Sequence, residues 1–409
     1  PLRHLRQHRT QEHEVSSNMG HTSPDAFSVA DKAQPEGRHV PLVVVGGGTT
    51  GLSAATAAAR SGMEVLLIDE NPMDISMMSM DVPLHFGQGM MTSIEDRGTM
   101  LQRMVSSNED LHHAEEAGVD IMLSTYVWGA YRNSENVREL NGPMLGVAND
   151  EKSWFIEYDQ IVVAAGARDL VMAFEGSEKA GTLGANGAWS LMERYQALAA
   201  RRIVVIGSGN IGLKTAQMAL DRGIQVAGVV EVGPEVRGNS ALLNRLKCQG
   251  VPFYVSHSVR RAVGRGEDVE GIEIMEVGKD LRPVSRSEKL IECDGIVLAI
   301  GLVPNVELLD LLGVDLPFQS TMGGFAPRPD EWMGTNVPSV YVAGDGAGFQ
   351  DYMILNENFA RTQGTLAGLA AADGGGAGVR VLVTGSILLV GDVLAELVRR
   401  GQWAPSYTL

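Results

Sequence analysis

The sequence predicts an α/β protein built from two similar units, and three observations lead to this prediction. A buried strand, a glycine-rich turn and a helix of small residues follow one another from residue 41, and the same pattern returns from residue 201. Each copy is followed by an alternating strand and by a buried strand that ends in small residues and glycine. The length of 409 residues allows two or three domains. Such an internal duplication implies two similar α/β units.

The composition supports a globular protein and argues against several classes of function. Apolar residues make up 44% of the chain and charged residues 20%, which suits a normal core. The net charge of −17 argues against binding of nucleic acids or anionic membranes. Two cysteines cannot build a disulfide framework or a four-thiolate iron–sulfur site. No apolar run approaches the roughly 18–20 residues of a membrane span, and we expect a cytoplasmic protein.

Both ends of the chain differ from its centre. Residues 1–39 are polar and lack apolar periodicity, so they predict a disordered leader. Several histidines fall in this leader, and metal binding is the alternative interpretation of them. Residues 373–409 begin with the flexible sequence DGGGAG and predict a linker followed by a strand–helix tail.

The first glycine-rich turn carries the strongest signal. Gly46, Gly48 and Gly51 follow a β-branched run and open a helix. In this spacing the first glycine permits the turn, the second lets the backbone approach a pyrophosphate, and the third lets the helix lie close to the sheet. The next strand ends at Asp69, whose carboxylate is suited to adenosine ribose hydroxyls, with Glu70 as the neighbouring alternative.

The second glycine-rich turn repeats this spacing with Gly207, Gly209 and Gly212, and its following strand ends at Glu231. An acid at this position favours a free 2′-hydroxyl, so it indicates NAD(H) rather than NADP(H), and Arg237 could soften that preference. The alternatives are another adenine nucleotide, or a degenerate fold that binds nothing.

A third motif lies near the end of the core, in TNVPSVYVAGDGAG. A buried strand ends there at Gly344 and Asp345. Together with the two glycine turns, and with the connecting motifs VVAAG and VLAIG that end at Gly166 and Gly301, it resembles the flavoproteins with two dinucleotide-binding domains. The resemblance covers about residues 40–372, with the motifs in the family's order.

The resemblance implies two Rossmann-like domains, the second inserted into the first, each with a small β-meander. The expected domains are an FAD-binding domain at 40–192 and 288–372 and a second nucleotide-binding domain at 195–287. FAD would be held by the first glycine turn, by Asp69 and by Asp345, which would reach the ribityl chain or the pyrophosphate. The second glycine turn and Glu231 would hold the second nucleotide.

Departures from the family pattern narrow the expected function. The stretch directly after the second strand, residues 71–91, holds no cysteine, so a redox disulfide beside the flavin is not expected. The chain is similar to the large subunits of heteromeric amine and amino-acid dehydrogenases of the opine oxidase, hydroxyproline dehydrogenase, hydrogen cyanide synthase and sarcosine oxidase types. That resemblance implies an FAD-dependent oxidoreductase that oxidises a C–N bond of a small amine or amino acid, together with a smaller FAD-dependent catalytic subunit. It also implies a possible FMN at the subunit interface.

Two other functions remain open at this point. One is a self-contained NADH-dependent flavoprotein reductase, and the other is a non-catalytic scaffold subunit that binds nucleotides. Flavin chemistry demands no particular acid–base residue. His85 is the one candidate, because it lies in the stretch that approaches the flavin in relatives.

The remaining histidines, methionines and cysteines of note are expected to have structural roles. The adjacent His112 and His113 diverge by about 100° on a helix and are poorly placed to chelate a metal. The methionines between residues 77 and 91 suggest flexible packing near a cofactor or an interface. Cys248 and Cys293 are expected to be buried packing residues.

Overall fold

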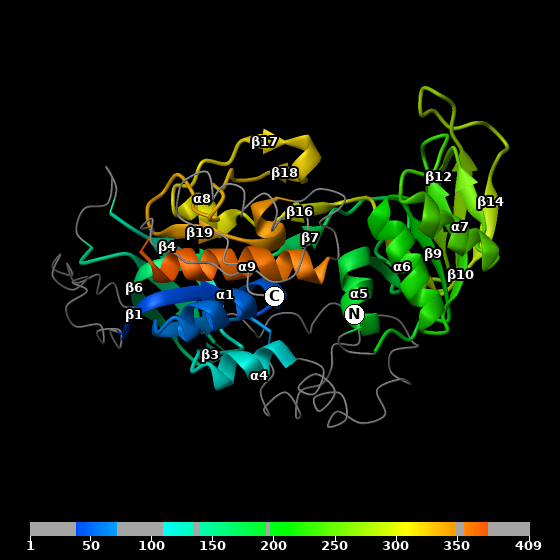
Figure 1. Cartoon of the computed structure of the whole chain (residues 1–409). Helices are drawn as coiled ribbons and strands as arrows, with labels where there is room; N and C mark the ends of the chain where they lie inside the picture. Colours follow the sequence, from blue (N-terminus) through cyan, green and yellow to red (C-terminus); the bar gives the residue numbers. More distant parts are fainter. Residues whose placement is uncertain are drawn as a thin grey trace, which may run out of the picture. The chain divides into compact units, whose positions relative to one another are not determined.

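The computed structural model describes residues 38–71, 109–133, 140–149, 151–193, 197–348 and 356–374, and Figure 1 shows their helices and strands. Nearly all of the predicted leader, the stretch around His85 and most of the C-terminal tail lie outside the described residues. Among the described helices, none combines the length and the apolar character needed to cross a membrane.

The first sheet contains parallel and antiparallel strands in the order β3-β2-β1-β6-β5-β4. Strands β1, β2, β3 and β6 run parallel, and β19 pairs in parallel with the end of β6. Strands β4, β5 and β6 are antiparallel and form the predicted small meander. The bounds are β1 (Arg38–Val45), β2 (Val65–Ile68), β3 (Asp120–Met122), β4 (Tyr126–Tyr131), β5 (Met144–Ala148), β6 (Ser153–Val163) and β19 (Val340–Val342).

Both faces of the first sheet are covered. Helices α1 (Thr49–Arg60), α4 (Glu109–Glu116) and α9 (Glu357–Ala372) bury one face, where Leu42, Val44 and Leu67 join their core. The other face packs under α8 (Glu307–Leu311) and includes Val43 and Ile68. Because both faces are buried, residues 40–45 of β1 and all of β2 are continuous apolar runs without alternation. Helices α1 and α9 lie side by side (Figure 1).

The second sheet is wholly parallel, in the order β11-β10-β9-β15-β8. Helices pack on one face, and an antiparallel meander covers the other. The strands are β8 (Thr182–Gly184), β9 (Arg202–Ile206), β10 (Gln225–Glu231), β11 (Phe253–Val255) and β15 (Gly295–Leu298). The helices are α5 (Ala185–Glu193), α6 (Asn210–Asp221) and α7 (Ser240–Cys248), and the meander is β12 (His257–Val263), β13 (Gly271–Glu276) and β14 (Lys289–Glu292).

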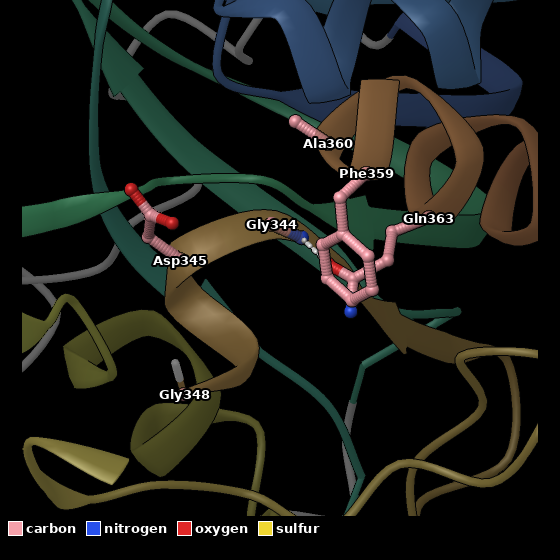
Figure 2. A pocket seen from close by; sticks show the side chains of 6 residues that line it. All are labelled: Gly344, Asp345, Gly348, Phe359, Ala360 and Gln363. Carbon is pink, nitrogen blue, oxygen red and sulfur yellow. Dashed lines mark hydrogen bonds between the residues drawn. The ribbon is translucent and has the colours of Figure 1, made fainter. Parts of the chain in front are cut away.

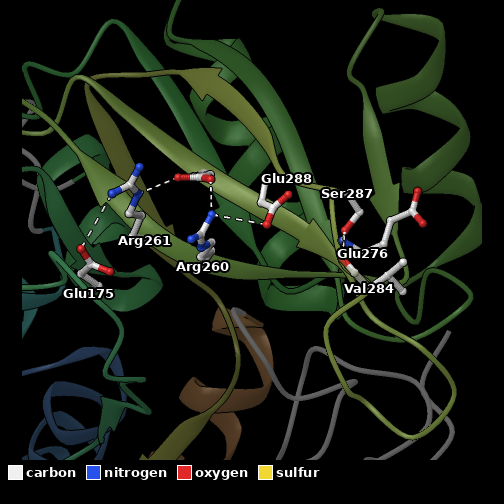
Figure 3. A network of polar contacts seen from close by, with 8 residues as sticks. Glu175, Arg260, Arg261, Glu276, Val284, Ser287 and Glu288 are labelled. Carbon is white, nitrogen blue, oxygen red and sulfur yellow. Dashed lines mark hydrogen bonds and ion pairs between the residues drawn. The ribbon is translucent and has the colours of Figure 1, made fainter.

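On the outer side of this meander, ion pairs join β12 to β13 and to neighbouring segments. On β12, Arg260 and Arg261 donate to the two carboxylate oxygens of Glu273 at 2.7 and 2.6 Å. Arg261 also lies 3.9 Å from Glu175, in the segment that leads to β8, and Arg260 lies 3.5 Å from Glu288 (Figure 3). The meander is therefore linked by ion pairs on one side while its other side joins the core.

The chain order is the one that an inserted domain requires, because the strands of the second sheet, from 182 to 298, fall between β6 and β19. The strand positions differ from the expected boundaries of 192 and 288. β8 and β15 pair within the second sheet, since β15 is buried and pairs in parallel with β9. β1 also begins at Arg38 rather than at residue 40.

Short strands join the two sheets. β7 (Ala167–Asp169) and β16 (Leu302–Pro304) form an antiparallel pair where the chain leaves the first sheet and returns to it. β17 (Phe318–Gln319), η4 (Ser320–Met322) and β18 (Gly324–Phe325) form a small hairpin before β19.

Candidate functional site

The first glycine turn joins β1 to α1. Two of its glycines pack closely against backbone atoms, and the third faces open space. Gly46 has a φ of +110°, and a Cβ there would lie 2.2 Å from the carbonyl oxygen of Ala164. A Cβ on Gly51 would lie 1.8 Å from the carbonyl oxygen of Gly46. Gly48 caps α1, and a Cβ there would meet no atom within 4 Å. The turn thus requires glycine on its inner side and leaves the N-terminal N–H groups of α1 open at Gly48.

Of the two acids after β2, Asp69 is the one that reaches this turn. One of its oxygens accepts a hydrogen bond from the Gly47 N–H. The other accepts from the backbone N–H and side-chain amide of Asn71, at 2.7 and 2.9 Å. Asp69 is partly exposed, whereas Glu70 is exposed. The position of Asp69 is compatible with a nearby ribose, and this role stays a prediction.

The third motif places the Asp345 carboxylate just beyond the end of β19. The 3₁₀ helix η5 (Gly344–Ala347) begins there, and the Gly344 N–H donates to Gln363 Oε1 of α9 at 2.9 Å. Figure 2 shows a hollow at this point, with the Asp345 side chain turned away from Phe359 and Gln363. No described residue donates a hydrogen bond to the Asp345 carboxylate, and partial desolvation by its surroundings raises its pKa. Its position is compatible with hydroxyl groups of a ligand, and this role stays a prediction.

Glycines in α9, which the sequence analysis missed, bring η5 and α1 together. A Cβ on Gly364 would lie 2.0 Å from the carbonyl oxygen of Thr50, and a Cβ on Gly368 would lie 2.1 Å from that of Ala54. Helix α9 therefore packs backbone to backbone against α1. The four-residue spacing of the two glycines was the available signal.

The second glycine turn has the same backbone requirements as the first. Gly207 has a φ of +105°, and a Cβ there would lie 2.3 Å from the carbonyl oxygen of Ala299. A Cβ on Gly212 would lie 2.1 Å from the carbonyl oxygen of Gly207, whereas one on Gly209, which caps α6, would meet no atom within 4 Å. Ala164 and Ala299 carry no signal of their own in the sequence, although each lies two residues before the glycine of a connecting motif.

Glu231, at the end of β10, is only 4% exposed. Its Oε2 accepts hydrogen bonds from the Ser208 backbone N–H and hydroxyl at 3.2 and 2.6 Å, and its Oε1 accepts from the Gly233 N–H at 2.7 Å. Burial alone would raise the pKa of Glu231, but these bonds and the charge of Arg237 lower it below its usual value. Glu231 is therefore an ionised carboxylate held by the protein's own donors.

The glycines of the connecting motifs lie where the chain turns between sheets. Gly166 follows β6 with a φ of +69°, and Gly301 follows β15 with a φ of +150°. Asn305 joins the two motifs, because its backbone N–H donates to Gly166 O at 3.0 Å and its amide to Ala165 O at 2.9 Å. Asn305 is a further residue that sequence reasoning missed, and Gly166 and Gly301 as cofactor ligands stay predictions.

The remaining candidates contribute little to these sites. His85 and the methionine cluster lie outside the described residues. His112 lies 3.7 Å from Glu115 at the surface, and the described part of the chain holds no group of three His, Cys, Asp or Glu side chains suited to a metal.

The two cysteines differ. Cys293 is buried, and burial raises the pKa of its thiol to about 12. The prediction of a buried side chain is wrong for Cys248, which is exposed because Leu246 is the residue of α7 that faces the core.

The residues of both turns fit dinucleotides. Each turn presents a glycine-capped helix N-terminus with open space at its second glycine, which is where a pyrophosphate lies in such folds. Fold and site together define an α/β protein with two dinucleotide-type turns.

The chain belongs to the pyridine nucleotide-disulphide oxidoreductase family, whose model matches residues 40–374. This family consists of FAD-dependent oxidoreductases that also use NAD(P)H.

Curated relatives are similar to most of this chain, and a solved structure shares its fold. The chain is 25% identical over 345 residues to an opine oxidase subunit of Agrobacterium tumefaciens, covering 81% of this chain and 65% of that protein. It is 24% identical over 317 residues to NADH oxidase of Methanocaldococcus jannaschii, covering 74% of this chain and 62% of that protein. The chain thus spans less than two thirds of either relative. The crystal structure of T. acidophilum thioredoxin reductase shares the fold, with a TM-score of 0.58 and 22% identity, over 82% of this chain and 98% of that one.

Proposed function

We propose that the chain is the FAD- and NAD(P)-binding subunit of a multi-subunit amine or amino-acid dehydrogenase. In this proposal a smaller FAD-dependent subunit oxidises the C–N bond of the substrate. The similarity to an opine oxidase subunit, which is by its name one part of a larger enzyme, supports this function. FMN at a subunit interface and a cytoplasmic location belong to the same proposal.

The observation that carries the proposal is the combination of two complete dinucleotide turns with the absence of a cysteine pair. The sequence holds only Cys248 and Cys293, one exposed and one buried with a raised pKa. Dithiol exchange needs an accessible pair of low-pKa thiols, so this chemistry is not supported. Flavin-based electron transfer without thiols is the function that these residues favour.

The chain's own residues would bind and orient the cofactors. The N-terminus of α1 would hold the FAD pyrophosphate at Gly48, and Asp345 would accept hydrogen bonds from its polyol hydroxyls. The N-terminus of α6 would hold the second nucleotide at Gly209 in the same way. Bound flavin supplies the redox chemistry, and the protein supplies position and electrostatics.

A self-contained NADH-dependent reductase is the second candidate, favoured by the similarity to NADH oxidase. It differs from the first proposal in the source of electrons. In the reductase the nucleotide at Gly209 reduces the flavin directly, whereas in the dehydrogenase the electrons come from the partner's substrate.

Anaerobic flavin reduction separates these functions. The FAD-loaded chain alone is mixed with NADH or NADPH and then, with any flavoprotein that co-purifies from its native cells, with a panel of amines and amino acids. The dehydrogenase proposal predicts loss of flavin absorbance only with the partner and an amine. Rapid bleaching by a reduced nicotinamide with the chain alone would favour the reductase. Gly209→Ala is the matched variant, because it alters only the second turn.

A further inference from the structure

Strand β4 leaves one edge of the first sheet unpaired. It lies at the end of the strand order and pairs with β5 alone. No described residue outside β5 makes a backbone hydrogen bond to this strand. A free edge of this kind presents a row of N–H and C=O groups that can pair with a further strand.

The other edges of the three larger sheets, within the described ranges, are short or charged. Strands β3, β8, β11 and β19 are three residues long. Strands β12 and β14 are longer, and they carry Arg260, Arg261 and Lys289. Short strands and charged side chains are two ways in which proteins prevent edge-to-edge pairing. The six residues of β4, YVWGAY, include no charge and no proline, so this edge lacks both protections.

Aromatic rings are exposed along this strand and are held in place. Tyr126, Trp128 and Tyr131 are 50%, 47% and 37% exposed. Trp128 Nε1 donates to Ser153 Oγ at 3.1 Å, and a Cβ on Gly146 of β5 would lie 2.5 Å from the Trp128 ring. The rings of Trp128 and Tyr131 meet edge to face, with 6.0 Å between their centroids. Rings that are already ordered lose little entropy when a partner covers them.

The strand has the same pattern from either end. Each end has an exposed tyrosine followed by a residue that packs on the core side of the sheet, Val127 at one end and Ala130 at the other. Trp128 and Gly129 lie at the centre, where a β-bulge shifts the alternation of sides by one residue. In an antiparallel pair of two such strands, exposed residues would therefore face exposed residues and core residues would face core residues. The strand is self-complementary under a two-fold axis.

The charge of the chain also favours a second copy at this edge. Two copies, each with a net charge of −17, repel one another where charged surfaces meet. Strand β4 offers six consecutive residues without charge, so pairing along it brings no like charges of the strand into contact.

We propose that two copies of the chain associate by antiparallel pairing of their β4 strands, with Tyr126 of each copy opposite Tyr131 of the other. The first sheet would then continue across the two-fold axis. This inference depends neither on the nucleotide sites nor on a smaller subunit, so its failure would leave the proposed function untouched.

The test exchanges charges at the two tyrosines. Sedimentation velocity of the full chain over a range of concentrations should show a dimer. Tyr126→Lys combined with Tyr131→Lys sets lysine against lysine at both symmetry-related contacts, so the dimer dissociation constant should rise at least about 30-fold. Tyr126→Lys combined with Tyr131→Glu sets lysine against glutamate at the same contacts, and its dissociation constant should be about tenfold lower than that of the first variant.

Tyr126→Lys alone covers the case in which the double variants lose their structure, as seen by far-UV circular dichroism. Among the described residues, the Tyr126 ring takes part in none of the ring contacts of Trp128 and Tyr131, so this variant should fold and should raise the dissociation constant about tenfold. Phe318→Lys is the matched control. Phe318 is an exposed aromatic residue of β17, away from β4, and its replacement should leave the dissociation constant unchanged.

Three results would overturn the inference. One is a monomeric parent, whether another segment of this chain or a different protein covers the edge. Another is a dimer that Tyr126→Lys weakens no more than Phe318→Lys does. The third is equal dissociation of the lysine–lysine and lysine–glutamate variants, because antiparallel pairing in this register requires the second to recover affinity.

Discussion

The two glycine turns have nearly the same backbone and different surroundings. Gly46 and Gly207 have φ values of +110° and +105°, and in both turns a Cβ on the first glycine would strike the carbonyl oxygen of an alanine. The difference lies in the acids. Asp69 is partly exposed beside Gly47, whereas Glu231 is buried against Ser208.

This comparison separates two tasks of a dinucleotide site. The backbone of the turn would determine where a pyrophosphate lies, and in both turns it leaves open space at the glycine that caps the helix. The side chains around the acid would determine which other part of a nucleotide is recognised. These side chains differ between the two turns. A glycine at 47 leaves Asp69 near the surface, while the serine at 208 holds Glu231 inside.

The largest expected effect is the separate loss of each nucleotide when its open glycine gains a methyl group. Gly48→Ala and Gly209→Ala place a Cβ in space that no protein atom occupies within 4 Å, so the fold should be retained. The Cβ would obstruct a pyrophosphate, and we expect at least a 30-fold loss, about 2 kcal/mol, of FAD affinity in the first variant and of nicotinamide nucleotide affinity in the second. Flavin content and calorimetric titration measure the two losses.

Gly187→Ala serves as the control for this pair. A Cβ at Gly187 in α5 also meets no atom within 4 Å, yet Gly187 lies in neither turn, so both affinities should stay unchanged. If Gly48→Ala retained FAD, or if either variant lost both nucleotides at once, the two turns would not be separate phosphate sites.

Asp345 distinguishes the first site from the second, and its charge should matter next most. Asp345→Asn keeps the shape and one acceptor oxygen but removes the negative charge, so FAD affinity should fall about tenfold. Nucleotide binding at the second turn should not change. An unaltered FAD affinity in Asp345→Asn would exclude this carboxylate as a flavin ligand.

The pH dependence of FAD binding tests the same carboxylate in another way. Partial desolvation raises the pKa of Asp345, and hydroxyl donors from a ligand would lower it again by favouring the charged form. FAD affinity should therefore be complete above the raised pKa and decline as the pH falls through it. Asp345→Asn should remove this decline, and a titration of flavin fluorescence at several pH values measures it.

Much of this architecture was predictable because backbone requirements leave a clear trace in the sequence. The two turns needed glycine at fixed spacing, and in VYVAGD a buried strand is followed directly by the turn that carries Asp345. The contacts between segments far apart in the chain are harder to predict from the sequence. Asn305 bonding to Gly166, and Gly364 lying against Thr50, depend on how two segments meet, which no local pattern encodes. The expected boundaries place β8 and β15 with the first sheet for the same reason, since their pairing in the second sheet is a tertiary property.

The smallest effect concerns Ser208, the residue that most separates the second turn from the first. Its hydroxyl donates to Glu231 at 2.6 Å, and Ser208→Ala should lower the free energy of unfolding by about 1 kcal/mol. Because hydrogen bonds lower the pKa of Glu231, this stabilisation exists above the usual glutamate pKa and is lost as the pH falls through the lowered one. The difference in free energy of unfolding between Ser208→Ala and the parent should therefore shrink in acid.

Ser53→Ala is the control. It removes a 2.7 Å hydrogen bond to the Thr49 carbonyl, in which no carboxylate takes part, so its difference in free energy of unfolding should not change with pH. Denaturant unfolding at several pH values measures both differences. If the loss of stability in Ser208→Ala did not depend on pH, the serine would not hold an ionised Glu231.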